Sequence, residues 1–494
     1  MFFAGIVQKG LLGPSNAGYW ALMGTFMTFF SFFGLGAYEG VTRQIPAHRG
    51  RGELAAAARV SDSAMTFTIL SQAICGTLVA AVAVAFGSGW AAPVRWGLVI
   101  IGLTGPLRLF ADCHKEILAA IKRFDAAGRA TVLQAVLALT VQTVLVIFLG
   151  YYGMFVGMVV QIAAALVLWN RMHLTSIRRP AFRFRIERAP LREAISFGLP
   201  FFLYAQIYLV FLSVDNLLVF HFLGAKSLGY YALACSVTSY LLYLPMSISA
   251  VLLPRMIERF SSGSDRRSIG GYATEVQRIF THVLLPPAIA GSFFLLPVLV
   301  RQALPAFAPA IPVIQVMVAG SFFISMVNMP AKTLMTVGLR WSVTALMLAC
   351  FIFNAGANFV ALGPLHLGVT AAAGATSISY LALFLSVTVY ALAKTDRGND
   401  IARHVGEQLL AGAYLFASIW AVEKLVGTGA GSAVHDIGFG LLKFALSMLL
   451  VSPLLIIDQR RNGTLSTAAG MVRSGLSGAR ATLRRRIAAR RADT

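Results

Sequence analysis

The stretch LLGPSNAGYWAL, residues 11–22, returns 211 residues later as LGAKSLGYYAL, residues 223–233. In each copy an apolar segment ends, a glycine (Gly13 or Gly224) supplies a tight turn, and a second apolar segment begins with Gly-Tyr. Tyrosine and tryptophan favour the boundary between lipid headgroups and hydrocarbon. The repeated phrase therefore predicts a hairpin of two membrane helices that occurs twice in the chain.

The composition agrees with a membrane protein. Of 494 residues, 58% are hydrophobic and 12% are charged, about half the charged fraction of a soluble domain. The four cysteines are scattered singly, with no CxxC pair, and the start of the chain lacks the features of a cleavable secretory signal. We expect packing cysteines, no cofactor, and delivery to the membrane through the spans themselves.

Hydropathy predicts an all-α polytopic protein with about fourteen spans. They are expected at 1–10, 18–38, 63–87, 94–114, 131–150, 153–170, 194–221, 229–253, 279–300, 311–334, 342–362, 368–393, 407–426 and 437–457.

The basic residues fix an expected orientation. If the first connection faces outward, 34 of the 41 lysines and arginines lie in the inward segments and the tail. The positive-inside rule then places both termini in the cytoplasm. This even distribution argues against nucleic-acid binding, despite a net charge of +22. For the tail, 458–494, two interpretations stay open: a basic helix on anionic membrane lipids, or a disordered segment that sets topology.

Six predicted spans separate the two copies of the phrase, so the two halves of the chain point the same way, as in a parallel repeat. The first copy has only about ten apolar residues before it, which rise ~15 Å against a hydrocarbon core of ~30 Å. The first span is therefore too short as written, and we expect about twenty more residues, by comparison with the second copy, to precede Met1.

The second copy and the late segment FNAGANFVALGPLHLGVTAAAGATSISY (353–380) resemble the polysaccharide transporters of the multidrug/oligosaccharidyl-lipid/polysaccharide superfamily, especially Wzx-type O-antigen flippases. The resemblance covers nearly the whole chain and is strong for the superfamily but weak for the substrate. It rests on Asp215, Leu223, Gly224, Gly229, Tyr230, Asn354, Asn358, Gly363, Gly368, Ala371, Ala372, Thr376 and Ser379.

This resemblance implies two six-helix lobes in a V, open alternately to the cytoplasm and the periplasm, with two extra helices outside them. The lobes would be 1–192 and 193–398, followed by the extra pair at 399–457. It also implies a polyprenyl-diphosphate-linked oligosaccharide as cargo, the bacterial inner membrane as location, a role in lipopolysaccharide and surface polysaccharide synthesis, and polymerases and glycosyltransferases as partners.

Charges within apolar spans are candidate functional groups, because burying one there costs at least ~2.5 kcal/mol. Asp215 is a candidate for binding a coupling cation or proton, or else it makes a capping or inter-lobe contact. Arg108 and Asp112 lie one turn apart on one helix. They either neutralise each other, or Arg108 grips a diphosphate and Asp112 serves as a second coupling candidate.

The remaining candidates for the substrate cavity also have two interpretations. Glu39 and Arg43 are expected to close the second span, as an anchoring pair or at the substrate entrance. Lys332 snorkels to the inner interface or contacts cargo. Asn354 and Asn358 share a helix face, where their amides bind sugar hydroxyls or hold helices together.

Three functions stay open from the sequence. A flippase fits the scarcity of membrane-embedded acids. A cation-coupled drug antiporter of the same superfamily needs more carboxylates, and Arg108 would repel its cationic cargo. A membrane glycosyltransferase, polymerase or ligase needs catalytic groups at an aqueous face, yet the outward connections are short and hold no DxD pair. We therefore expect a transporter and not an enzyme.

Overall fold

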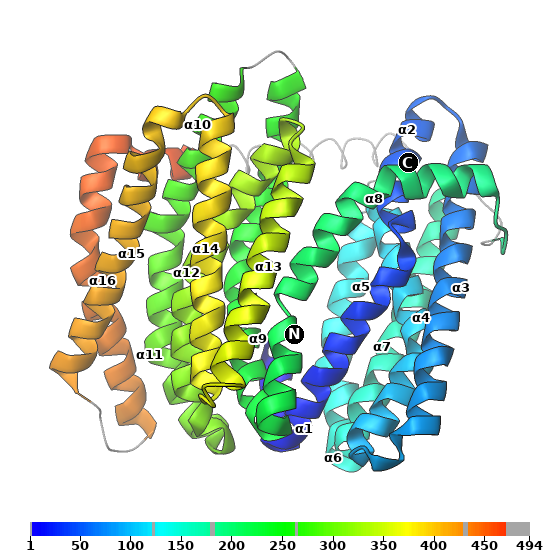
Figure 1. Ribbon diagram of the computed structural model, residues 1–494, viewed down its shortest axis with the longest axis horizontal. Coiled ribbons are helices and arrows are strands. Elements are labelled where there is room, and N and C mark those ends of the chain that lie inside the picture. Colours follow the sequence, from blue (N-terminus) through cyan, green and yellow to red (C-terminus); the bar gives the residue numbers. More distant parts are fainter. Residues whose placement is uncertain (1, 121–123, 178–182, 262–264, 428–432, 471–494) are drawn as a thin grey trace, which may run out of the picture. The chain divides into compact units, whose positions relative to one another are not determined.

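The computed structural model describes residues 2–120, 124–177, 183–261, 265–427 and 433–470, and all regular elements within these ranges are helical (Figure 1). The α-helices are α1 (Phe2–Phe30), α2 (Ala37–Gly50), α3 (Leu54–Phe86), α4 (Ala92–Ala120), α5 (Phe124–Leu137), α6 (Thr143–Leu149), α7 (Tyr151–Ile177), α8 (Arg188–Phe211), α9 (Val214–Ser261), α10 (Arg266–Ile279), α11 (Leu285–Ala303), α12 (Ile311–Thr336), α13 (Arg340–Leu362), α14 (Val369–Lys394), α15 (Ile401–Val426) and α16 (Ala433–Asn462).

The described helices confirm a polytopic membrane protein. Eleven helical stretches are long and apolar enough to cross a membrane, or up to twelve with the bent pair Ala4–Gly34 and Glu39–Gly50. The stretch Arg188–Ser249 has 62 residues, about three times the length that spans a bilayer, and contains two of the predicted spans. Because Ala4–Gly34 also contains two, twelve stretches agree with about fourteen predicted helices.

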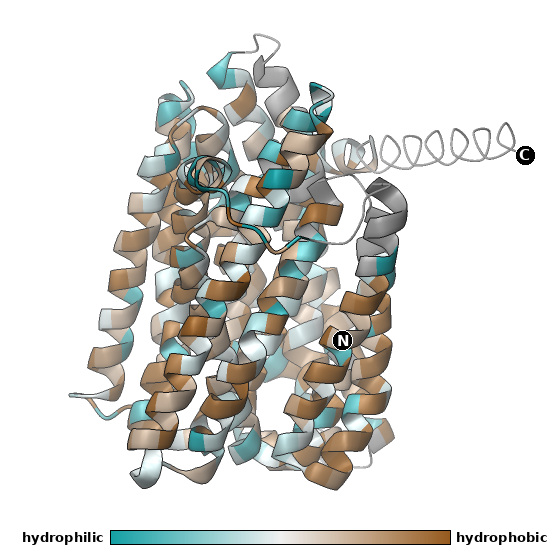
Figure 2. Cartoon of the chain, turned by 90° about the vertical axis from the view of Figure 1, so that its right-hand side faces the viewer, coloured by the Kyte–Doolittle hydropathy of each residue, from teal (hydrophilic) through white to brown (hydrophobic). Residues whose placement is uncertain are grey.

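The helices present apolar side chains outward, as lipid-facing helices do. Phe148 is 79% exposed, Leu425 82% and Val434 80%. Figure 2 shows hydrophobic residues along the middle of the helices, with hydrophilic residues gathered towards the helix ends and connections in the upper part of the view. A soluble protein would not leave so many large apolar side chains in water.

The repeated phrase has the same backbone in both copies. Helix α1 is broken at Gly13, with φ 70° and ψ 170°, and α9 is broken at Gly224, with φ 77° and ψ 179°. This left-handed region is costly for residues with a Cβ, so glycine is required at both breaks. The turn predicted at these two glycines is confirmed.

The two hairpins also pack against each other through a reciprocal contact. A Cβ built on Gly18 would lie 1.8 Å from the carbonyl oxygen of Ala225, and a Cβ built on Gly229 would lie 1.9 Å from that of Pro14. At the offset of 211 residues, Gly18 corresponds to Gly229 and Pro14 to Ala225. The contact therefore has the pairwise reciprocity of a two-fold interface, and glycine is the residue that permits it.

The chain divides into two compact units. The first comprises Met1–Ser236, Ala303–Met317 and Leu339–Ser379; the second comprises Val237–Gln302, Val318–Gly338 and Tyr380–Thr494. Both copies of the repeated phrase belong to the first unit. The lobes 1–192 and 193–398, which rest on the repeat, stay a prediction.

Local departures from regular helix occur in both units. A π-helical turn, Ala138–Gln142, separates α5 from α6 within the span predicted at 131–150. A second π-turn, Phe280–Leu284, joins α10 to α11. Such turns are frequent at functional sites. In the first unit, α8 begins across the direction of the spanning helices and then turns along them (Figure 1).

Candidate functional site

Asp215 lies in the first arm of α9 and is the centre of a buried polar cluster in the first unit. Its side chain is 1% exposed. Its Oδ2 accepts hydrogen bonds from the hydroxyl of Tyr231, in the second arm of α9, and from the hydroxyl of Thr376 on α14, the latter at 2.9 Å. Two donors on one oxygen hold the carboxylate in a fixed orientation.

Asn354 and Asn358 on α13 complete this cluster and are both fully buried. Asn358 Nδ2 donates to Oδ1 of Asn354 at 2.7 Å and to the Thr376 hydroxyl at 3.2 Å, and Asn354 Nδ2 donates to the carbonyl of Phe211 at 3.2 Å. The structure thus joins these two asparagines to the partner of Asp215. Through these bonds the two amides link α13 to α8 and α14.

Two oxygens of the cluster face no donor. Oδ1 of Asp215 and Oδ1 of Asn358 are buried without a hydrogen-bond partner in the described part of the chain. Carboxylate, amide and hydroxyl oxygens are the ligands of hard cations. Among the described residues no group of three or more His, Cys, Asp or Glu could hold a metal ion.

Lys9 lies beside this cluster and was not among the candidates from sequence. It projects from the first arm of α1, and its Nζ donates to the hydroxyl of Ser236 at 2.5 Å and to the carbonyl of Ala232 at 3.5 Å. Both partners lie on α9 just after Tyr231. Hydropathy placed Lys9 at the end of a short first span, where a lysine is ordinary.

Arg108 and Asp112 are both exposed on α4, and no ion pair joins them among the described residues. Arg108 Nη1 instead donates weakly to Sδ of Met27 on α1, at 3.5 Å. The two side chains are therefore not in ion-pair contact, although the charge of Arg108 still acts on the Asp112 carboxyl one turn away. An exposed guanidinium in the apolar stretch Ala92–Lys115 calls for water or a polar ligand.

Glu39 and Arg43 lie on α2, which is a separate helix and not the end of the second span. The chain breaks at Ser31–Gly36, and Glu39–Gly50 is bent by 71° from Ala4–Gly34. Glu39 occupies the first turn of α2, where a carboxylate is favoured by the helix dipole. The side chain of Arg43 lies outside the described residues.

Lys332 lies on α12 in the second unit, whereas the other candidate residues belong to the first unit. It is half-buried, and its side chain makes no hydrogen bond or ion pair with the described residues. Helix α12 continues through Pro330 to Thr336. This position is compatible with a snorkelling lysine.

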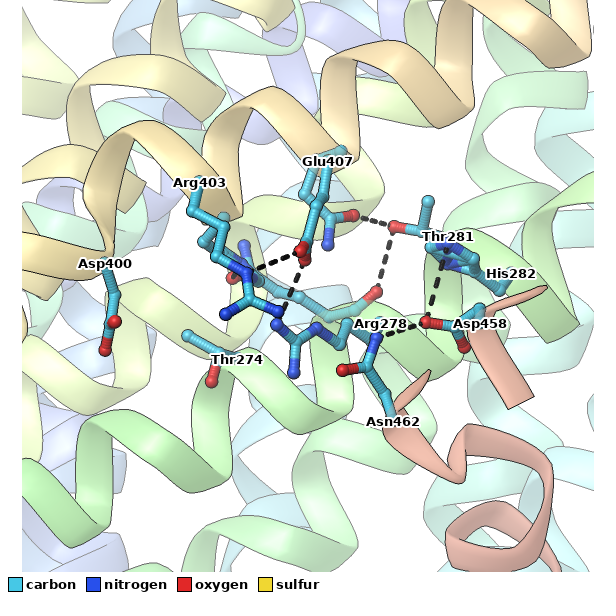
Figure 3. A network of polar contacts seen from close by, with 12 residues as sticks. Thr274, Arg278, Thr281, His282, Asp400, Arg403, Glu407, Asp458 and Asn462 are labelled. Atoms are coloured by element: carbon cyan, nitrogen blue, oxygen red, sulfur yellow. Dashed lines mark hydrogen bonds and ion pairs between the residues drawn. The ribbon is translucent and has the colours of Figure 1, made fainter. Parts of the chain in front are cut away.

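A second polar network lies in the second unit, where α10, the π-turn, α15 and α16 meet (Figure 3). Glu407 accepts from Arg278 Nη2 and from Arg403 Nε, each at 3.0 Å. Asp458 accepts from Asn462 Nδ2 at 2.7 Å, and its Oδ1 lies 3.9 Å from Nε2 of His282. Every carboxylate in this network faces a cationic or amide donor.

Gln277 anchors the same network to its own unit. Its Nε2 donates to the carbonyl of Met326 at 3.0 Å and to Thr388 at 3.3 Å, and its Oε1 lies 2.9 Å from Nε2 of His404. The amide thereby connects α10 to α12, α14 and α15. We interpret this network as the joint that holds the last two helices to the rest of the second unit.

This network was not predicted, because its members lie far apart in the chain. Arg278, Glu407 and Asp458 each stand at one edge of the spans predicted at 279–300, 407–426 and 437–457, where charges are common.

The comparisons with known proteins agree with this architecture. A family model described as "Polysaccharide biosynthesis protein" matches residues 10–305. The chain belongs to this polysaccharide biosynthesis family. The matched region includes both copies of the repeated phrase and Asp215. No curated protein sequence matches the chain.

Solved structures show the same fold at low sequence identity. An inward-facing multidrug resistance MATE family transporter of the MOP superfamily has a TM-score of 0.68 at 13% identity, over 81% of this chain and 94% of that one. The lipid II flippase MurJ, in an inward closed conformation, has a TM-score of 0.66 at 14% identity, over 93% and 98%. An outward-facing MATE family transporter has a TM-score of 0.57 at 12% identity, over 80% and 91%.

Proposed function

We propose that this member of the polysaccharide biosynthesis family is a flippase. It moves polyprenyl-diphosphate-linked oligosaccharide across the bacterial inner membrane by alternating access, with both termini in the cytoplasm, and supplies surface polysaccharide synthesis, including O-antigen. The glycan headgroup does not cross hydrocarbon unaided, because its hydroxyls and diphosphate lose their hydrogen bonds to water there. A protein with polar groups inside its helical bundle replaces those bonds.

The observation that carries this proposal is Arg108. It is exposed on an apolar span and makes no ion-pair contact with a carboxylate among the described residues, so its guanidinium N–H groups are available to an anionic ligand. A guanidinium binds a diphosphate through paired, charge-assisted hydrogen bonds. The lipid II flippase with the same fold supports a lipid-linked cargo, since its alignment covers 93% of this chain.

The buried Asp215 cluster is the proposed site for a coupling cation. Its ligands would be the open oxygens of Asp215 and Asn358 together with the hydroxyl of Thr376. Helix α1 contacts both this site and Arg108. Its Thr25 accepts a hydrogen bond from Asn216, the neighbour of Asp215, at 3.0 Å, and its Met27 accepts one from Arg108. A shift of α1 would therefore change the surroundings of both Asp215 and Arg108. Asp112, exposed on α4, is the weaker coupling candidate.

The drug-antiporter alternative requires a cargo site that attracts cations. Arg108 argues against it, because an unpaired guanidinium repels a cationic drug. The enzyme alternative requires catalytic groups at an aqueous face. The Asp215 cluster is instead buried between helices, where a glycan acceptor has no access, and the carboxylate of Glu407 is engaged by two arginines. Polymerases and glycosyltransferases are proposed as the partners that make and consume the cargo.

Depletion of the protein in its host tests the cargo. The flippase proposal predicts that lipid-linked oligosaccharide accumulates with its sugars on the cytoplasmic face, where externally added glycosidase does not reach them in intact spheroplasts. Accumulation on the outer face would instead indicate a polymerase or ligase, and unchanged glycolipid with increased drug sensitivity would indicate an antiporter.

Arg108→Ala tests the cargo site. We expect glycan export to fall by at least about tenfold, the loss of one charge-assisted contact, with normal amounts of protein in the membrane. Lys115→Ala, which removes an exposed charge from the same helix seven residues further on, is the matched control. Equal export by both variants and the unaltered protein would exclude Arg108 from the cargo site.

A further inference from the structure

Two oppositely charged side chains converge on one short segment of α9. Asp215 binds the hydroxyl of Tyr231, and Lys9 binds Ser236 and the carbonyl of Ala232. Tyr231 and Ser236 are five residues apart in one helix, so they are ~7.5 Å apart along its axis. The ammonium and the carboxylate therefore bind partners that are about one and a half turns apart on a single helix, in surroundings of low dielectric.

The two charged residues do not occupy equivalent positions in the two copies of the repeat. Lys9 lies four residues before Gly13, in the first arm of the first hairpin, and Asp215 lies nine residues before Gly224, in the first arm of the second. At the offset of 211 residues, the position of Asp215 corresponds to Ala4, and that of Lys9 corresponds to Phe220. The two equivalent arms thus share their backbone break and carry opposite charges.

We propose that Lys9 is the internal counter-charge of the Asp215 site and competes with the coupling cation for it. This inference rests on the proposed coupling role of Asp215 and assigns a residue that sets its affinity. Lys9 is a positioning residue, since it acts through the field at Asp215 and not by contact with the cation.

The physical reason is the cost of charge in a membrane interior. A buried carboxylate with one open oxygen is stabilised by a nearby positive charge, from either a bound cation or an ammonium. While Lys9 supplies that charge, a second cation gains less by binding, because the two positive charges repel. Cation affinity at Asp215 therefore depends on how near Lys9 lies.

This dependence couples cation binding to helix movement. Lys9 belongs to α1 and Asp215 to α9, and the two hairpins meet at the reciprocal Gly18 and Gly229 contacts. A movement of the first arm of α1 along α9 would carry the ammonium away from Asp215 and raise its affinity for a cation. Bound cation would in turn favour the conformation in which Lys9 is displaced.

Sodium-dependent thermal stability tests the inference on the detergent-purified full chain. Sodium chloride is titrated against N-methyl-D-glucamine chloride at constant ionic strength, and the unfolding midpoint gives the sodium concentration for half-maximal stabilisation. For Lys9→Met we expect that concentration to fall by about tenfold, the effect of removing a like charge in a medium of low effective dielectric. Lys9→Gln replaces it if the methionine variant does not fold.

Two controls separate charge from structure. Lys9→Arg keeps the positive charge, and its half-maximal sodium concentration should stay within about twofold of the unaltered chain. Ser236→Ala removes the hydrogen bond of Lys9 and keeps its charge, so the unfolding midpoint without sodium should fall while the sodium concentration hardly moves. A structural role alone would make Lys9→Met behave like Ser236→Ala.

The outcomes distinguish this inference from the proposed function. If sodium stabilises the unaltered chain and Asp215→Asn loses that response, but Lys9→Met titrates like the unaltered chain, the role of Lys9 is wrong and the site at Asp215 stands. If Asp215→Asn keeps the response, or if sodium stabilises neither the unaltered chain nor Lys9→Met, the cation site and the inference both fall.

Discussion

The α1 hairpin and the α9 hairpin turn at Gly13 and Gly224 with φ values of 70° and 77°, yet one places a lysine and the other an aspartate against the same segment of α9. The backbone of the repeat is retained where the hairpins touch each other. The chemistry differs where each first arm faces the interior of the unit. We infer that the shared geometry maintains the fold, while the divergent side chains create a single asymmetric site.

The largest expected effect comes from breaking the shared geometry. Gly18→Ala or Gly229→Ala places a Cβ less than 2 Å from a carbonyl oxygen of the other hairpin, and backbone has little freedom to yield. We expect about 3 kcal/mol of destabilisation for each, measured as a lower unfolding midpoint in detergent. Gly24→Ala is the control, because no atom lies within 4 Å of its added Cβ; equal midpoints for Gly18→Ala and Gly24→Ala would refute the contact.

The network around Glu407 in the second unit, whose charges are paired, serves as a comparison for the charges near the two hairpins that make no ion pair among the described residues. Glu407→Ala leaves Arg278, whose side chain is 23% exposed, without its carboxylate, and we expect a cost of about 2–3 kcal/mol. Glu53, whose side chain is 47% exposed and pairs with His48 and Arg51, is the matched control, and Glu53→Ala should leave the midpoint unchanged. If glycan export is lost while the midpoint is preserved in Glu407→Ala, the network is functional and not a joint.

A smaller effect is expected from Tyr231→Phe, which keeps the buried ring and removes one donor to Asp215. The free energy of unfolding should fall by about 1–2 kcal/mol, because a hydrogen bond to a charged group is lost. Protonation of Asp215 would offset part of that loss. Tyr208→Phe is the control, because its hydroxyl is buried without a partner in the described residues and its removal should be neutral or stabilising. The same thermal scans compare both variants.

The smallest change in stability is expected for Asp215→Asn. An amide of the same shape loses the attraction of Lys9 but also removes the cost of burying a carboxylate, and these two changes offset each other, so the free energy of unfolding should change by less than about 1 kcal/mol. Ion-dependent transport should nevertheless be lost, as measured by glycan export across sodium and proton gradients. Asp458→Asn is the control and should keep the dependence of export on the ion gradients. If Asp458→Asn lost that dependence, the coupling site would have to be assigned to the second unit.

The fold was largely predictable because hydrophobic length and turn chemistry are local properties. Fourteen predicted spans account for the helical stretches, and the turns at Gly13 and Gly224 follow from glycine in a repeated phrase. The bend before α2 was missed, since Ser31–Gly36 contains apolar residues that extend the hydrophobic run. Hydropathy does not register a change of direction within such a run.

The candidate site was predictable only in part. Asp215, Asn354, Asn358 and Arg108 were identified because polar groups are costly in apolar spans, and that cost is visible in the sequence. Their contacts were not visible: Thr376 was noted in the resemblance but not as a partner of Asp215, and the i,i+4 spacing of Arg108 and Asp112 suggested an ion pair that the fold does not form. Spacing along one helix gives neighbours on that helix but not contacts between helices.

The sequence by itself determined that this chain is a polytopic helical membrane protein with a repeated hairpin, because hydrophobic segments of bilayer length must pair their backbone groups internally as helices. Tertiary structure alone decided that Lys9 binds Ser236 on α9, that Arg108 and Asp112 make no ion-pair contact, and that Glu407 is neutralised by two arginines. Packing brings together residues more than a hundred positions apart, and the energy of a charge depends on those neighbours.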